Sequence, residues 1–153
     1  LMKRVTHWPQ FFLGLAFNWG ILVAWASVTG GLGLPALLLY AAGIAWTLGY
    51  DTIYAHQDKE DDALIGVKST ALKFEENTKP WLWGFYALTV VLIAAAGWST
   101  ELGWPFYALL VLGAAQLVWQ LINLDFDDPV DCLAKFKSNR YFGFIVLAGF
   151  LAG

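Results

Sequence analysis

The sequence predicts an all-α protein, a polytopic bundle of transmembrane helices, on the basis of three observations. It is 59% hydrophobic and only 14% charged, with a mean hydropathy of +0.58, whereas soluble domains are nearer a quarter charged. Its apolar residues form runs long enough, at about 1.5 Å per residue, to cross a hydrocarbon core of about 30 Å. All nine Lys and Arg lie outside these runs. A soluble helical domain of 153 residues would have to bury several such runs, so we expect a membrane protein.

Five apolar segments are expected as spans of a single domain over residues 1–153: about 10–29, 35–56, 80–99, 105–122 and 141–153. Each of the first four begins at a proline, where a missing N–H costs nothing: Pro9, Pro35, Pro80 and Pro105. The last segment is short, so it either crosses incompletely or has lost its end. Small residues inside the spans predict close helix packing: Gly14, Gly20, Gly43, Gly49 and residues 94–97.

The placement of charge predicts the orientation. If the loops alternate between the two sides of the membrane, residues 1–9, 57–79 and 123–140 share one side, which holds every Lys and Arg. The turns on the opposite side, near 30–34 and 100–104, contain one charged residue, Glu101. This asymmetry assigns the charged side to the cytoplasm, or to the matrix for a mitochondrial inner membrane, and we expect the functional residues there. No basic patch suits nucleic acid.

The acidic segment "YDTIYAHQDKEDDALIGVKSTA", residues 50–71, directly follows an apolar stretch that is expected to be helical. If that helix continues through residue 62, one face carries Asp51, Tyr54, Asp58 and Asp61/Asp62. Asp58 and Asp62 would repel each other unless a cation lies between them, and an all-oxygen set suits Mg²⁺ better than zinc. A solvated loop is the alternative, although an acid such as Asp51 at a membrane interface is costly and more often functional.

Continued as "YDTIYAHQDKEDDALIGVKSTALKF", this segment resembles the second aspartate-rich motif of the UbiA-type intramembrane prenyltransferases, in particular those that act on 4-hydroxybenzoate in ubiquinone synthesis. "MKRVTHWPQ" is similar to that family's loop before the fifth helix, and "CLAKFKSNR" to the loop before its last helix. The resemblance covers the chain as the C-terminal portion of a bundle of about nine helices. It implies Mg²⁺-dependent transfer of a polyprenyl group from polyprenyl diphosphate to the ring of 4-hydroxybenzoate, within the lipid bilayer.

Carried over to this sequence, the resemblance implies catalytic roles for four acids: Asp51, Asp58, Asp61 and Asp62. Asp58 and Asp62 are the expected Mg²⁺ ligands, with the other two as further ligands or as groups that orient them. Three basic residues are expected to bind the diphosphate: Lys3, Arg4 and Lys68. Ordinary positive-inside topology is the alternative for Lys3 and Arg4.

Two further residues are expected in the substrate cavity, Tyr54 and Asn18. For Asn18, a polar residue within an apolar span, a hydrogen bond between helices is the other interpretation. "NLDFDDPVDCLAKFKSNR" holds a second acidic cluster, which we interpret as a solvated loop because Pro129 is expected to break any helix there. Cys132, with neither a helix N-terminus nor a histidine base, is expected to be a bystander. Asn139 and Arg140 could reach the site from the start of the last span.

The sequence departs from the family in one respect, because the first aspartate-rich motif, of the pattern N-D-x-x-D, is absent. We therefore expect this chain to be the C-terminal part of an enzyme and to be inactive alone. The alternatives are a prenyltransferase of the same superfamily with another acceptor, such as a homogentisate or naphthoate ring, or an inactive remnant. A cation-handling membrane protein is disfavoured, because the middles of the five expected spans lack ionisable residues.

Overall fold

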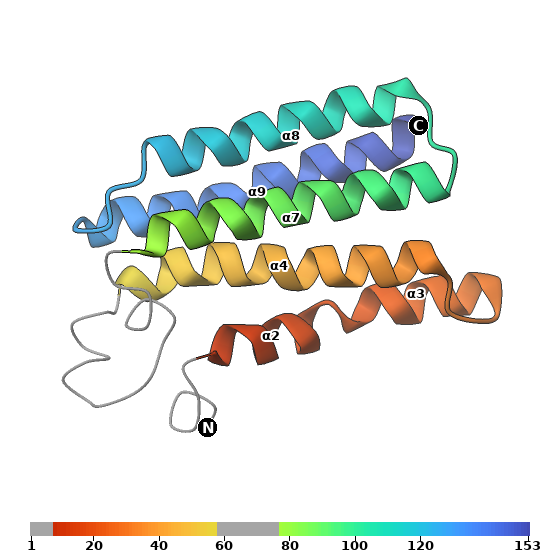
Figure 1. Cartoon of the computed structure of the whole chain (residues 1–153), viewed down its shortest axis with the longest axis horizontal. Helices are drawn as coiled ribbons and strands as arrows, with labels where there is room; N and C mark the ends of the chain where they lie inside the picture. The colour runs from red at the N-terminus through yellow and green to blue at the C-terminus, as the bar shows by residue number, and fades with distance from the viewer. Residues whose placement is uncertain (1–7, 58–76) are drawn as a thin grey trace.

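The structure, a computed structural model, describes residues 8–57 and 77–153, and within these ranges the chain is helical without any strand (Figure 1). The described helices are α2 (Pro9–Phe17), α3 (Trp19–Thr29), α4 (Leu34–Gln57), α7 (Thr78–Ser99), α8 (Trp104–Ile122) and α9 (Pro129–Ala152). Four stretches are long and apolar enough to cross a membrane: Pro9–Thr29, Leu34–Gln57, Thr78–Ser99 and Trp104–Ile122. The predicted class, an all-α bundle of transmembrane helices, is confirmed.

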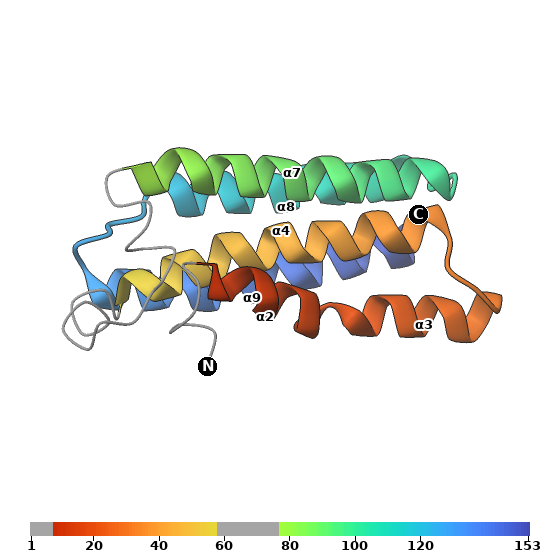
Figure 2. The ribbon, with the colours of Figure 1, turned by 60° about the horizontal axis from the view of Figure 1, so that its bottom comes forward.

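α2 and α3 run in the same direction along the bundle, and α4, α7, α8 and α9 then alternate in direction (Figure 1). α8 packs against α7 and α9, α4 packs against α7 and α9, and α2 and α3 lie along α4 (Figures 1 and 2). One end of the bundle gathers the start of α2, the end of α4, the start of α7, the end of α8 and the start of α9 (Figure 1). The α3–α4 and α7–α8 turns lie at the other end, with Gly153. We call the first of these the α4-exit end.

The first apolar segment is not one helix but two, separated at Asn18. The Asn18 backbone N–H donates to the Gly14 carbonyl at 3.2 Å, and the side-chain Nδ2 donates to the same oxygen at 2.8 Å. A side-chain amide that competes for a carbonyl in this way interrupts the helical ladder. α3 then ends at Gly30, whose φ of 78° is the left-handed conformation that glycine adopts readily at a helix C-terminus.

Glycine allows α4 to approach its neighbours closely. A Cβ at Gly49 would overlap the ring of Tyr86 on α7. Gly14, Gly43 and Gly97 are likewise in tight contact, with Ile44, Asn18 and Phe106 respectively. The prediction of close packing is confirmed at these four glycines. It is wrong at Gly20, where a Cβ would meet nothing within 4 Å.

The buried core lies between α4, α7, α8 and α9, and includes Ile53, Leu82, Phe106, Leu117 and Phe142. The outer faces of the bundle carry many large apolar side chains, among them Val28 at 85% exposure and Leu151 at 81%. An apolar surface of this extent is unfavourable in water and suits contact with lipid or with further protein.

The last helix starts before the last expected span, and the expectation that Pro129 breaks a helix was wrong. α9 begins at Pro129, well before residue 141, and Pro129 occupies the first helical position instead of breaking a helix. The proline ring is accommodated there because the first turn has no use for its N–H. Asp128 caps the helix, with its Oδ1 accepting from the Val130 N–H at 2.9 Å. Residues 129–140 are therefore helical and carry their side chains along α9.

Candidate functional site

Most of the sequence-predicted site lies outside the described residues: Asp58, Asp61, Asp62, Lys3, Arg4 and Lys68. The described members are Asp51, Tyr54 and Asn18. α4 carries Asp51 and Tyr54 in its last two turns and ends at Gln57, the last described residue before Asp58. Within residues 8–57 and 77–153, no group of three or more His, Cys, Asp or Glu could hold a metal. The Mg²⁺ site and the continuation of the helix to residue 62 remain predictions.

Aromatic side chains join α4 to α9 beside Asp51. The Phe136 ring of α9 lies 4.8 Å from the Tyr54 ring and 5.7 Å from the Tyr50 ring, and Trp46 lies 5.4 Å from Tyr50. The α4 members are spaced by four residues and so follow one side of the helix. We call these four residues, Trp46, Tyr50, Tyr54 and Phe136, the aromatic wall. It holds the last turns of α4, with half-buried Asp51, in a defined position against α9.

Asn18 makes a hydrogen bond between helices, as one interpretation of the sequence predicted. Its Nδ2 donates to Thr47 Oγ1 of α4 at 3.1 Å, and Thr47 Oγ1 in turn donates to the Gly43 carbonyl at 2.8 Å. Tyr50 OH donates to the same hydroxyl at 3.2 Å. The break between α2 and α3 is thus tied to the α4 face that leads toward Asp51.

Asn18 also lines an apolar cavity of about 290 Å³ between α3, α4, α7 and α9. Its walls are Asn18, Ile21, Leu39, Ala42, Gly43, Trp46, Thr89, Ile93, Phe142, Gly143, Val146, Leu147 and Phe150. Small-molecule sites are typically cavities of roughly this size or larger, mostly apolar with a few polar groups. A hydrocarbon chain suits this lining. The role of Asn18 in a substrate cavity remains a prediction.

A buried polar network crosses the bundle between this cavity and the α4-exit end. The Trp46 Nε1–H donates to Asn139 Oδ1 at 2.9 Å. Tyr86 OH donates to Gln120 Oε1 at 3.1 Å, and Gln120 Nε2 donates to Ser138 Oγ at 2.8 Å. The Asn139 Nδ2 donates to the carbonyls of Lys135 and Phe136, each at 3.2 Å. Side chains from α4, α7, α8 and α9 are therefore held in one register.

Sequence reasoning named only one member of this network, Asn139, as a residue that could reach the site. Gln120, Tyr86 and Trp46 were missed. The available signal was the presence of an amide side chain, Gln120, within an apolar span, since such residues usually bond across helices. Nothing in the sequence identifies which helices it joins.

The second acidic cluster is ordered by the start of α9. Asp131 forms an ion pair with Lys135, one turn later, at 2.7 Å, and its other oxygen accepts from the Asp125 N–H at 3.0 Å. Burial disfavours the Asp131 carboxylate, but the Asp125 and Lys135 hydrogen bonds outweigh this and lower its pKa. The Lys135 ammonium also lies 5.0 Å from the Trp119 ring centroid. Asp125, Asp127 and Asp128 lie exposed in the loop before α9, as the sequence analysis expected, and Asp128 caps the helix. Asp131 differs, because it lies in the first turn of α9.

Cys132 lies in the first turn of α9, contrary to the expectation that no helix N-terminus was near it. Burial and the charges of the surrounding aspartates nevertheless raise the pKa of its thiol to about 11. Its Sγ donates to the Asp125 carbonyl at 3.3 Å. A buried thiol in this protonation state is a poor nucleophile, so Cys132 has a structural role.

Comparison with known proteins identifies the family. A model of the UbiA prenyltransferase family matches residues 1–148. The chain belongs to this family. No solved structure matched the chain.

The chain is also similar to individual members of the UbiA family. It is 51% identical to the mitochondrial 4-hydroxybenzoate polyprenyltransferase of Arabidopsis thaliana, 53% identical to that of Drosophila melanogaster and 50% identical to that of Homo sapiens, in each case over 100% of the chain. It covers 38%, 39% and 42% of those proteins, respectively. The chain therefore spans about two fifths of the length of the relatives that it matches.

Proposed function

We propose that this chain is the C-terminal part of a 4-hydroxybenzoate polyprenyltransferase, which transfers a polyprenyl group from polyprenyl diphosphate to 4-hydroxybenzoate in ubiquinone synthesis. The observation that carries the proposal is the identity of about one half, over the whole chain, to proteins of that name from a plant, an insect and a mammal. The activity is that of the whole protein. The rest of the relatives' length corresponds to a part that would supply the first aspartate-rich motif.

The second aspartate-rich motif would hold Mg²⁺ through Asp58 and Asp62, with Asp51 and Asp61 as further ligands or orienting groups. Bound Mg²⁺ neutralises the negative charge that develops on the departing diphosphate. The position of Asp51 fits this role, because α4 carries it at the α4-exit end, and its carboxylate oxygens are the donors that Mg²⁺ prefers. Lys3, Arg4 and Lys68 would bind the diphosphate. The charge asymmetry of the sequence supports a site on the cytoplasmic or matrix face of an inner membrane.

In the proposed reaction, the allylic C–O bond breaks and its electron pair leaves with the diphosphate. The ring carbon ortho to the phenolic hydroxyl forms a bond to the allylic carbon, and the ring then loses the proton from that carbon. The apolar cavity of about 290 Å³ beside Trp46 supports this chemistry, since an apolar lining disfavours the water that would hydrolyse an allylic cation.

Prenylation by the complete protein in isolated membranes tests the proposal. Asp58→Asn and Asp62→Asn should each abolish turnover of 4-hydroxybenzoate, as should removal of Mg²⁺ with a chelator. Asp127→Asn is the matched control, because Asp127 is an exposed acid at the same end of the bundle and should tolerate the change. Full turnover in both motif variants would contradict the assignment. Faster turnover of a homogentisate or naphthoate acceptor would instead favour another branch of the family.

A further inference from the structure

We infer that Arg140, together with the aromatic wall, binds the aromatic acceptor, with the guanidinium group on the acceptor's carboxylate. This inference rests on the proposed function and adds to it the recognition of one substrate. It is carried by the depth of Arg140 in the bundle, its place along α9 beside the cavity, and the lack of an anionic partner within the described residues.

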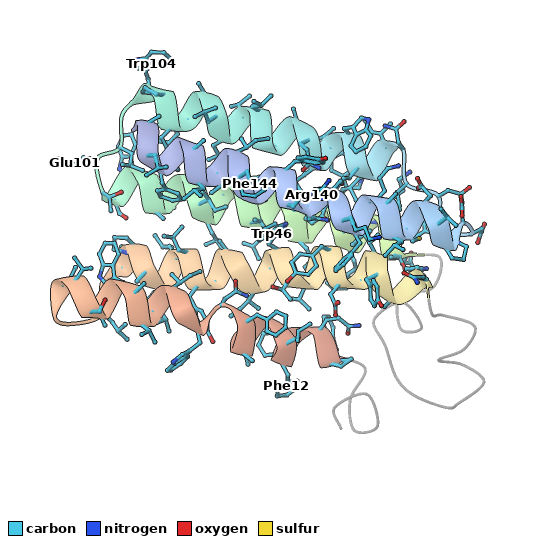
Figure 3. The ribbon with its side chains drawn as sticks, turned by 180° about the vertical axis from the view of Figure 1, so that it is seen from behind. Phe12, Trp46, Glu101, Trp104, Arg140 and Phe144 are labelled. Carbon is cyan, nitrogen blue, oxygen red and sulfur yellow. The ribbon has the colours of Figure 1, made fainter. Side chains whose placement is uncertain are left out.

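Arg140 lies at the level of the middle of α4 and not at either end of the bundle. Its neighbour Asn139 accepts the hydrogen bond from Trp46, which is near the middle of α4 (Leu34–Gln57). Because α9 begins at Pro129, Arg140 stands about 16 Å along the helix at 1.5 Å per residue. Figure 3 shows Arg140 and Trp46 at neighbouring levels on the two helices. An ionised side chain at such depth is costly against lipid and is usually turned to the protein interior or to a functional cavity.

The same stripe of α9 carries Arg140 and the cavity wall. Arg140, Gly143 and Leu147 are spaced i, i+3 and i+7, which places them on one side of the helix, and the last two line the cavity. Across from them, Trp46 lines the cavity from α4, and Tyr50 continues its side of the helix toward the α4-exit end. Arg140 thus lies next to the cavity on α9, and the aromatic wall lies next to the cavity on α4.

Within residues 8–57 and 77–153, no carboxylate lies within ion-pair distance of Arg140. Its Nη2 donates to the OH of its neighbour Tyr141 at 2.8 Å, and its guanidinium carbon lies 4.8 Å from that ring's centroid. Both side chains are exposed in this part of the protein. The guanidinium group therefore retains donors for an anion, and its planar fork matches a carboxylate.

An aromatic acid has the two features that this place can recognise. Its carboxylate would take paired hydrogen bonds from Arg140, and its ring would pack edge-to-face or offset against Trp46, Tyr50 or Phe136. In 4-hydroxybenzoate, the carboxylate lies opposite the hydroxyl, so anchoring the carboxylate leaves the carbon ortho to the hydroxyl uncovered. An aliphatic carboxylate would lack the ring contacts, and a neutral phenol would lack the anion.

Steady-state kinetics of the complete protein in membranes tests the inference, with both substrates varied. Arg140→Gln should raise the KM for 4-hydroxybenzoate by about 10- to 100-fold, since hydrogen bonds to a charged group are among the stronger ones. The KM for polyprenyl diphosphate should stay within about twofold of the wild type. Arg140→Lys retains the charge but loses the fork, so it should give a smaller rise. Lys137→Gln, at an exposed cation on the same helix, should change neither constant.

The outcomes separate the possible anions. If Arg140 instead pairs with a carboxylate elsewhere in the complete protein, Arg140→Gln should lower stability and impair both substrates alike, which would overturn the inference. Should Arg140→Gln fail to accumulate, Arg140→Lys carries the test, and an unchanged acceptor KM in that variant would also overturn it. A wild-type protein that does not prenylate 4-hydroxybenzoate would refute the proposed function itself.

Discussion

Gly49→Ala is expected to destabilise the bundle, even though alanine is the better helix former. Gly49 lies inside α4, and a Cβ at this position would overlap the ring of Tyr86 on α7. Tyr86 is only 3% exposed, and its OH donates to Gln120 Oε1 at 3.1 Å. The ring cannot swing aside without giving up this hydrogen bond, so the helices or the network must move.

The expected magnitude follows from three contributions. Replacing glycine by alanine in a helix interior is worth about 1 kcal/mol in favour of the variant. Overpacking of a well-filled contact costs about 1–3 kcal/mol. Displacing the Tyr86 hydroxyl from Gln120 Oε1 leaves that buried hydroxyl without its shorter hydrogen bond, which costs about 1–3 kcal/mol more. The net loss in the free energy of unfolding is therefore about 1–5 kcal/mol.

Unfolding in mixed micelles, followed by loss of helical circular dichroism as denaturing detergent is added, measures this difference. Gly84→Ala is the matched control, since Gly84 is inside α7 and a Cβ there would meet nothing within 4 Å. It should be neutral or stabilising by up to about 1 kcal/mol. In a Tyr86→Ala background, the penalty of Gly49→Ala should largely vanish. Equal stability of Gly49→Ala and Gly84→Ala would refute the reasoning.

Two further predictions concern the start of α9. Cys132, the one cysteine of this sequence, should react with iodoacetamide at pH 7.5 more than about a hundredfold slower than in the denatured chain, because a thiol pKa of about 11 leaves little thiolate. The labelling rate, followed by mass spectrometry, should increase as the pH rises toward that pKa. Fast labelling near neutral pH would contradict this prediction. Asp128→Ala should cost about 0.5–2 kcal/mol in the same detergent titration, through loss of the cap on Val130, whereas Asp127→Ala should have a smaller effect; equal losses would argue against the cap.

The sequence was a good guide where hydrophobic length and proline agree. α4, α7 and α8 begin close to Pro35, Pro80 and Pro105 and end close to the limits expected from their apolar runs. The length of an apolar run does not reveal a break within it. The break at Asn18 depends on a side chain that forms hydrogen bonds with its own helix and with Thr47 of α4. A polar residue in an apolar run suggests a bond between helices, but not an interruption of the span.

The start of α9 was misjudged for a physical reason. Asp131, Lys135 and Lys137 dilute the hydropathy of its first turns, so a segment recognised by apolar content begins too late. Local chemistry held the better signal, since an aspartate directly before a proline is a favourable helix start. Hydropathy indicates whether a helix lies against apolar surroundings, whereas a capping residue indicates where the helix begins.

That boundary also affects the charge on which the acceptor site is proposed, because the sequence analysis placed Arg140 just before the last span and not within a helix. With a span beginning at residue 141, Arg140 would be an ordinary cation at the membrane surface. The helix that begins at Pro129, held in register by the bond from Trp46 to Asn139, carries it to the level of the middle of α4. The depth of a charge in a helical membrane protein thus depends on how neighbouring helices are aligned. One hydrogen bond between two side chains can therefore decide whether an arginine is interpreted as a topology signal at the membrane surface or as a ligand-binding residue.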